Sequence, residues 1–260
     1  MTRPRRLVIV ARITWTVASL CVEQLIVCTL AVIPVALLWT QALTWTSHAG
    51  PGRVALVSVL LVPSYVLFTL CLMLVSGLTV RALHAGTPPD LEMRISELGW
   101  PLLRWARHMV RLHIVRVLSG TLFRGSPIWT AYLRLNGARI GRRVYVNTTF
   151  VSDYNLLEFG DDVVVGAEAH ISGHTVEGGV VKTGRVRLGR NVTVGLGSVI
   201  DIGVDIGANT QIGALSFVPK HTSWPGAAVY AGIPIRRLES IPVESKRPRG
   251  QARPMRRPSS

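Results

Sequence analysis

Residues 188–229 read LGRNVT VGLGSV IDIGVD IGANTQ IGALSF VPKHTS WPGAAV, and this repeat of six residues decides the fold. Every unit opens on a large apolar residue, namely Leu188, Val194, Ile200, Ile206, Ile212, Val218 and Trp224. A period of six matches neither a single helix nor simple alternation, but it fits a short strand, a corner and another short strand. The small residue that follows, usually Gly, lets the backbone turn. The repeat predicts a parallel β-helix.

The same pattern extends upstream with two irregular places. Hexads begin at Ile140 and Val146, and after a slip of one residue they resume at Phe159, Val165 and Ile171. The period fails again over residues 177–187. Twelve hexads at three per turn make about four turns. Insertions in a solenoid commonly carry its working site, so residues 152–157 and 177–187 are where we expect chemistry.

Two apolar segments precede the repeat. No charge occurs over residues 25–45 or residues 54–80, and about 20 apolar residues suffice to cross a bilayer. Two transmembrane helices are therefore predicted, against the alternative of a buried helical hairpin in a soluble protein. Glu23, just before the first segment, is expected near a membrane interface rather than in a proton relay.

Arginines flanking these segments predict their orientation. They lie before the first span and after the second, whereas Arg53 alone lies between the spans. By the positive-inside rule both termini and the β-helix face the cytoplasm, in a multi-pass protein of the cell membrane. Cys21, Cys28 and Cys71 all belong to the apolar region, so neither a disulfide framework nor a thiolate metal site is indicated.

The chain thus divides into a membrane domain (residues 1–95), an amphipathic connection (96–136), the β-helix domain (137–238) and a basic tail (239–260) predicted to be disordered. In the connection, Met109, Val110, Ile114 and Val117 recur at helical spacing, and Arg104, Arg107 and Arg111 form another stripe. This pattern favours a helix in the membrane surface, with its arginines near anionic lipid. A soluble helix packed on the coil is the alternative.

The formal charge of +15 is compatible with three kinds of anionic partner: nucleic acid, lipid or substrate. No nucleic-acid-binding motif accompanies it, and much of the charge flanks the two apolar segments. We therefore expect membrane lipid as a partner and no nucleic acid.

The hexads, with the closing Ala231-Gly232-Ile233-Pro234-Ile235, resemble the left-handed β-helix of hexapeptide-repeat acyltransferases. More narrowly, residues 123–238 resemble the membrane-associated C-terminal units of ε-poly-lysine synthetase-like peptide synthetases. The matching pieces are LRLNGARIG at residues 133–141, EFGD at 158–161, GHTVE at 173–177, and Lys182 before VRLG at 186–189. Gly178 departs from the family motif, which has Asp there, and no adenylation or carrier domain is present.

This resemblance implies transfer of an acyl or aminoacyl group from a thioester to an amine or hydroxyl of a small acceptor. The donor would be an aminoacyl carrier protein of a peptide synthetase, or acyl-CoA in an O- or N-acetyltransferase of a lipid or saccharide. The resemblance implies no tightly bound cofactor. It does imply a homotrimer, because such coils commonly build their sites between subunits. The alternative from another class is a non-catalytic scaffold that recruits a synthetase.

Acyl transfer needs a base for the attacking group, and histidine titrates near neutral pH. His174, at the edge of the repeat break, is the first candidate, as the resemblance also implies, and His170 is the second. A carboxylate could orient the imidazole. The family motif suggests Glu177, which requires a turn at the following glycines, and Asp153 is the geometric rival from the phase slip.

Other candidates are assigned to substrate binding: Lys182, Tyr154 and Glu158. On paper, His170, His174 and Glu177 make a set of metal-binding residue types. Their spacing is not that of a helical zinc motif, so no metal site is predicted.

Overall fold

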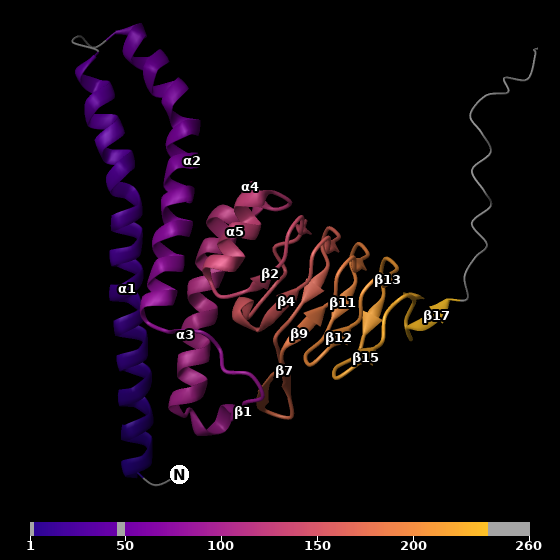
Figure 1. Cartoon of the computed structure of the whole chain (residues 1–260). Helices are drawn as coiled ribbons and strands as arrows, with labels where there is room; N and C mark the ends of the chain where they lie inside the picture. The colour runs from indigo at the N-terminus through magenta and orange to yellow at the C-terminus, as the bar shows by residue number, and fades with distance from the viewer. Residues whose placement is uncertain (1–2, 46–49, 239–260) are drawn as a thin grey trace, which may run out of the picture.

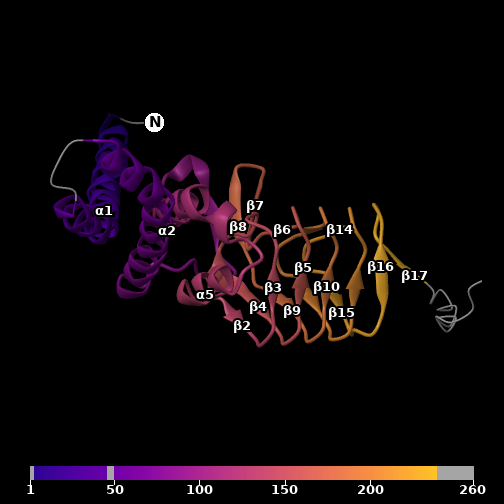
Figure 2. The same ribbon diagram turned by 90° about the horizontal axis from the view of Figure 1, so that it is seen from above.

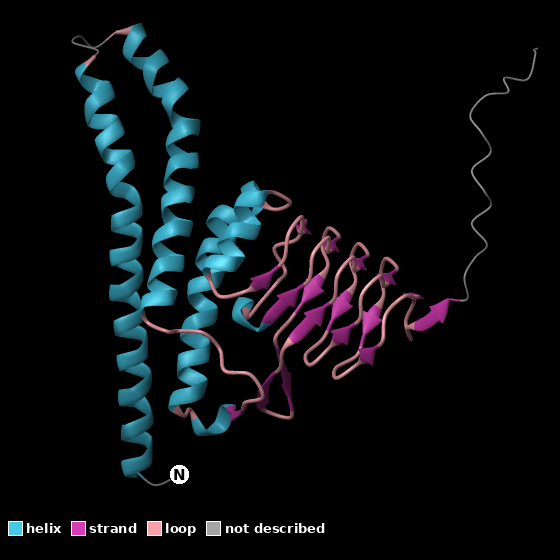
Figure 3. Cartoon of the chain, viewed as in Figure 1, coloured by secondary structure: helices cyan, strands magenta, loops and turns pink. Residues whose placement is uncertain are grey.

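The computed structural model describes residues 3–45 and 50–238, which form a long helical hairpin, a group of shorter helices and a β-helix (Figure 1). Figure 3 shows the helices gathered at one end of the coil, and the view from above in Figure 2 shows the coil extending away from them. The helical elements are α1 (Arg3–Thr44), α2 (Pro51–Ala82), α3 (Trp100–Val115), the π-helical turn η2 (Arg116–Gly120), α4 (Thr121–Phe123) and α5 (Pro127–Leu135).

Helices α1 and α2 pack against each other as an antiparallel pair (Figure 1). Both are long and apolar enough to cross a bilayer, and most of their apolar side chains are exposed, for example Leu25 and Val62. The core helix of a soluble protein would bury such residues, so the exposed surface argues against that alternative. Pro34 and Pro63 are accommodated inside the two helices.

Helix α3 lies beside the N-terminal half of α1 (Figure 1) and is joined to it by ion pairs. Arg107 Nη2 lies 2.6 Å from Glu23 Oε2, and Arg111 also contacts this carboxylate. Arg107 Nη1 donates in addition to Ser19 Oγ at 2.7 Å. Glu23 therefore holds α3 against α1.

The stripe of Met109, Val110, Ile114 and Val117 is not the buried face of α3, and its position in a membrane surface stays a prediction. Val110 and Val117 are exposed, while a different face is buried, comprising Leu102, Leu103, His108, Arg111, Leu112 and Val115. The physical reason is the pairing with Glu23, which makes burial of the Arg111 guanidinium tolerable.

The β-helix consists of three parallel sheets, with one strand of each sheet in most turns. The first sheet holds β2 (Arg139–Ile140), β4 (Leu157–Phe159), β9 (Val186–Leu188), β12 (Asp205–Ile206) and β15 (Ser223–Trp224). The second holds β3 (Tyr145–Val146), β5 (Val164–Val165), β10 (Thr193–Val194), β13 (Gln211–Ile212) and β16 (Val229–Ala231). The third holds β6 (His170–Ile171), β11 (Val199–Ile200) and β14 (Phe217–Val218).

The predicted apolar positions point into the coil. Leu188, Val194, Ile200, Ile206, Ile212 and Val218 are at most 2% exposed, and each pairs with a similar residue one turn away. Parallel pairing over five strands of one sheet confirms the predicted β-helix. The left hand of the coil stays a prediction from the resemblance.

The coil has an inward-facing position at the phase slip that the hexad pattern does not indicate. Val151 is buried and bridges Ile171 in parallel, so it fills the corner position that the phase slip obscures. The short 3-10 turn η3 (Tyr154–Leu156) then returns the chain to β4.

At the second irregularity the chain leaves the coil as an antiparallel hairpin of β7 (His174–Glu177) and β8 (Val180–Thr183). Strand β1 (Glu92–Arg94), which follows α2 and precedes the 3-10 turn η1 (Ile95–Glu97), pairs with β8. The far end of the coil is closed by β17 (Arg236–Leu238), antiparallel to β16. The predicted disordered tail, residues 239–260, lies outside the described residues.

Replacing Ile200 by Ala should lower the free energy of unfolding by about 2–5 kcal/mol, because this fully buried side chain fills the centre of the coil. Denaturant unfolding of the coil, followed by circular dichroism, measures the change. The matched control is Val199→Ala, because Val199 faces outward. This substitution should lower the free energy of unfolding by about 1 kcal/mol or less. An equal cost for the two variants would contradict the inward register.

Candidate functional site

His174 lies where the chain leaves the coil. It follows β6 by three residues and opens β7, so its backbone belongs to the hairpin rather than to a coil sheet. Ser172 steadies this exit, because its Oγ donates to the His174 carbonyl oxygen at 2.6 Å and accepts from the His174 N–H at 3.2 Å. The side chain of His174 is 24% exposed.

Asp153 approaches this histidine from the earlier phase slip. Its backbone is left-handed, with φ 48°, a conformation that is uncommon for a residue with a side chain and often marks a functional site. A Cβ at Gly173 would lie 2.7 Å from the Asp153 Cβ. Glycine at 173 therefore permits the close approach of the two segments.

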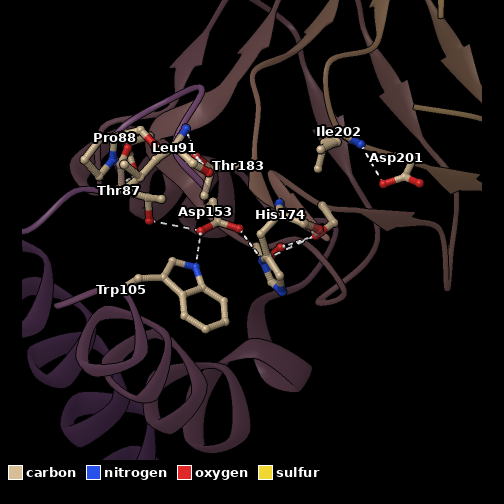
Figure 4. Close-up of polar contacts among 12 residues, drawn as sticks. Thr87, Pro88, Leu91, Trp105, Asp153, His174, Thr183, Asp201 and Ile202 are labelled. Carbon is tan, nitrogen blue, oxygen red and sulfur yellow. Dashed lines mark hydrogen bonds and ion pairs between the residues drawn. The ribbon is translucent and has the colours of Figure 1, made fainter. Parts of the chain in front are cut away.

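The carboxylate of Asp153 is completely buried and accepts three hydrogen bonds (Figure 4). Its Oδ2 lies 2.6 Å from His174 Nδ1. Its Oδ1 accepts from Thr87 Oγ1 at 3.0 Å and from Trp105 Nε1 at 3.2 Å. Because Asp153 accepts, we assign the proton of the neutral imidazole to Nδ1, which leaves the lone pair of Nε2 free to take a proton.

The indole of Trp105 also contacts the imidazole directly. The two rings meet edge to face, with centroids 4.9 Å apart. One tryptophan thus fixes both members of the pair, since it donates to the carboxylate and packs on the histidine ring.

His174 opens onto a groove of about 400 Å³ between α3 and the coil. The helical wall, from α3 and η2, is apolar with a basic end. Its lining residues are Trp105, Met109, Val110, Leu112, His113 and Arg116, and the other wall is formed by Val151, Ser152, Tyr154 and His174. Such a groove can hold a small acceptor or an acyl thioester beside the free imidazole nitrogen.

Glu177 does not pair with His174. The chain does turn at Gly178 and Gly179, but the antiparallel register places His174 opposite Thr183 and Glu177 at the hairpin tip. There Glu177 forms an ion pair with Lys220, which holds the pKa of this carboxyl below its ordinary value. Of the two predicted carboxylates, Asp153 is the one that contacts the histidine.

Two further candidates also lie apart from the groove. His170 points outward from β6, where its ring stacks on Phe150 with centroids 4.5 Å apart. Lys182 Nζ lies 3.3 Å from Glu92 Oε1, its partner across the β1–β8 pairing. Neither residue is brought to His174.

The candidates for substrate binding lie in different places. Tyr154 lines the groove as predicted, but it is fully buried and packs against Trp129 and Tyr132, and its hydroxyl is buried without a hydrogen-bond partner. Glu158 forms ion pairs with arginines on the outer face of the coil. Partial burial alone would raise its pKa, but Arg185 and Arg187 hold the pKa of Glu158 below its ordinary value.

Thr87, Trp105 and His108 are not among the predicted site residues. Thr87 and Trp105 lie 66 and 48 residues from Asp153 in sequence, and no motif marks them. His108 is fully buried one helical turn after Trp105, and neither ring nitrogen has a hydrogen-bond partner. Burial lowers the pKa of His108 to about 4, opposed by the charge of Asp153 and reinforced by that of Arg111.

Among the described residues, no group of three or more His, Cys, Asp or Glu side chains could hold a metal ion. The arrangement around His174 instead provides a carboxylate-oriented base at the edge of a groove. This set of groups is suited to removing a proton from an attacking amine or hydroxyl.

Comparison with known proteins agrees with this class of chemistry. No protein-family model matches the chain. It is 36% identical over 124 residues to galactoside O-acetyltransferase of Escherichia coli, spanning 44% of this chain and 59% of that protein. It is 28% identical over 111 residues to δ-poly-L-ornithine synthetase of Acinetobacter baumannii, spanning 43% of this chain but only 8% of the synthetase. The chain thus spans less than two thirds of either relative.

Solved structures with similar coordinates include galactoside acetyltransferase in complex with coenzyme A, with 20% identity, a TM-score of 0.42, and coverage of 53% of this chain and 82% of that one. Another is a maltose O-acetyltransferase from Clostridium difficile 630, with 20% identity and a TM-score of 0.43. The match covers 58% of this chain and 93% of that one. The sequence relatives support the class of hexapeptide-repeat acyltransferases, within which the chain resembles an acetyltransferase and a part of a synthetase.

The buried neutral His108 predicts a loss of stability in mild acid. Below pH 6.5 the unfolded chain binds a proton at this histidine, whereas the folded chain does so only near pH 4. The contribution of His108 to the free energy of unfolding should therefore fall as pH drops from 6.5 towards 4, by about 3 kcal/mol at most. Thermal unfolding of the detergent-solubilised protein across this range measures the slope.

His108→Leu is the comparison, because leucine keeps the bulk and cannot titrate. Its melting temperature should depend less steeply on pH over the same interval than that of the natural protein. Identical slopes for the two proteins would show that His108 is not buried in its neutral form.

Proposed function

We propose that this protein is a membrane-bound acyltransferase in which His174 acts as general base. The observation that carries the proposal is the 2.6 Å contact between His174 Nδ1 and the buried Asp153, beside a groove that reaches the same imidazole. A scaffold that only recruits a synthetase requires neither the oriented histidine nor the groove.

In the proposed reaction an acceptor amine or hydroxyl lies in the groove and attacks the carbonyl carbon of a thioester. Nε2 of His174 takes the proton of the attacking group as the new C–N or C–O bond forms. The C–S bond then breaks, and the imidazolium returns this proton to the leaving thiolate. Direct transfer of this kind needs no acyl-enzyme.

Asp153 has two tasks in this scheme. It keeps the proton of the neutral imidazole on Nδ1, and it stabilises the positive charge that develops on the ring during proton transfer. Thr87 and Trp105 hold the carboxylate by its other oxygen, so it cannot rotate away from the histidine.

The donor is proposed to be an aminoacyl group on a carrier protein, with condensation of the kind used by peptide synthetases. The match to δ-poly-L-ornithine synthetase supports this choice. Acetyl-CoA is the competing donor, supported by the higher identity to galactoside O-acetyltransferase. In either case, α1 and α2 would place the coil at the cytoplasmic membrane face, and a homotrimer stays a prediction.

His174→Ala should lower product formation by roughly 10²- to 10⁴-fold, the usual contribution of a positioned base. Purified full-length protein is supplied separately with acetyl-CoA and with aminoacyl-carrier thioester, together with amine and hydroxyl acceptors, and products are detected by mass spectrometry. His170→Ala is the control and should keep the natural rate, because His170 lies outside the groove. Full turnover by the His174 variant would overturn the proposed function.

Exchange of the two carboxylates separates their roles. Asp153→Asn should lower turnover by roughly 10²- to 10⁴-fold, because an amide can stabilise the wrong tautomer and does not compensate the imidazolium. Glu177→Gln should leave turnover unchanged, since that side chain pairs with Lys220. Both variants are first compared by melting temperature, and the kinetics are measured at a temperature where each is folded. A greater loss for the Glu177 variant would refute the assignment of Asp153.

A further inference from the structure

A second cavity, of about 760 Å³, shares Trp105 with the groove and has no role in the proposed reaction. It is bounded by α3 and by the segment that follows α2, including Leu83, Thr87 and Leu91. Figure 4 shows Thr87 and Leu91 on that segment, with Trp105 facing them from α3.

The α3 wall of the cavity is strongly basic. Arg104, Arg107 and Arg111 all line it, and Glu23 is the acid that pairs with two of them. Asp153 lies behind the wall, where its carboxylate is occupied by Thr87, Trp105 and His174. The three guanidinium groups thus face one paired carboxylate, and the site carries a positive excess.

Arg104 is the guanidinium available to a ligand. Its side chain is exposed, and it makes no ion pair with any of the described residues. It also lines a neighbouring cavity of about 420 Å³ with Trp15, Trp100 and Arg107. Arg107 and Arg111 donate to Glu23 and contribute charge, whereas the planar guanidinium of Arg104 can donate paired hydrogen bonds to the oxygens of a phosphate.

The position of the cavity indicates where such a phosphate comes from. Leu83 directly follows α2, and Glu23 lies just before the uncharged segment of α1. If both helices cross the bilayer, these points lie at the same inner boundary, where lipid headgroups are found. Leu83, Pro88 and Leu91 add apolar surface suited to the glycerol and first methylene groups of a lipid.

We propose that this cavity binds the phosphate of an anionic membrane lipid, with Arg104 as the principal contact and Arg107 and Arg111 as supporting charges. The inference rests on the membrane position in the proposed function and not on acyl transfer. Thr87 and Trp105 line the cavity and also donate to Asp153, so a bound lipid would touch both donors that hold the carboxylate.

The test measures lipid binding to the full chain in neutral detergent by native mass spectrometry, which needs no turnover. Phosphatidylglycerol is titrated against phosphatidylcholine, whose phosphate carries a compensating cation, and glycerol phosphate serves as the soluble phosphate. We expect retention of phosphatidylglycerol, weaker retention of phosphatidylcholine and no comparable binding of glycerol phosphate.

Two variants test the site by independent routes. Arg104→Gln should weaken phosphatidylglycerol binding about fivefold, the contribution of one cation near an anionic lipid. Ala85→Trp keeps every charge but fills the cavity, and it should weaken binding at least as much. Arg190→Gln removes the same charge from an exposed position on the coil and should bind lipid as the natural protein does.

Equal retention of the two lipids, equal effects of Arg104→Gln and Arg190→Gln, or unchanged binding by Ala85→Trp would overturn the proposal. So would glycerol phosphate bound as tightly as phosphatidylglycerol, because the source would then be soluble. Since lipid retention is scored without turnover, its failure is distinct from failure of the His174 test.

Discussion

The buried carboxylate of Asp153 is the constraint on which the arrangement of the chain depends. A carboxylate without water must be hydrogen-bonded, and here its three donors come from three separate segments. Thr87 follows the helical hairpin, Trp105 belongs to α3, and His174 begins the β-hairpin that leaves the coil. One charged group therefore joins the segment after α2, helix α3 and the β-hairpin that leaves the coil.

The coil was predictable because Ile200 and the equivalent buried residues recur every six positions, a period that is visible in the sequence. The two places where the interval fails also marked Asp153 and the hairpin carrying His174. The choice between Asp153 and Glu177 needed strand register, which sequence spacing does not supply. Thr87 and Trp105 were not predictable, because hydrogen bonds over 66 and 48 residues leave no local pattern.

The buried face of helix α3 was not predictable for a related reason. Arginines were assigned to a lipid-facing stripe by their charge, yet Arg111 is buried because Glu23, 88 residues earlier, neutralises it. The apolar periodicity of a sequence shows which residues share a face of the helix. Which face is buried depends on the elements that pack against the helix. Here the partner is a carboxylate of another helix, so Arg111 turns inward while Arg104 stays exposed, and the apolar residue Val110 lines the groove.

The pairing of β1 with β8 joins the end of the helical hairpin to the insertion in the coil by main-chain hydrogen bonds. The coil is consequently joined to the helices by more than the chain that connects them. Its hexads are self-contained, but two of the groups that hold Asp153 belong to the part of the chain before the coil. The proposed site is therefore built by the coil together with the helical part of the chain. A related coil that lacks these helices must hold its corresponding carboxylate by other means.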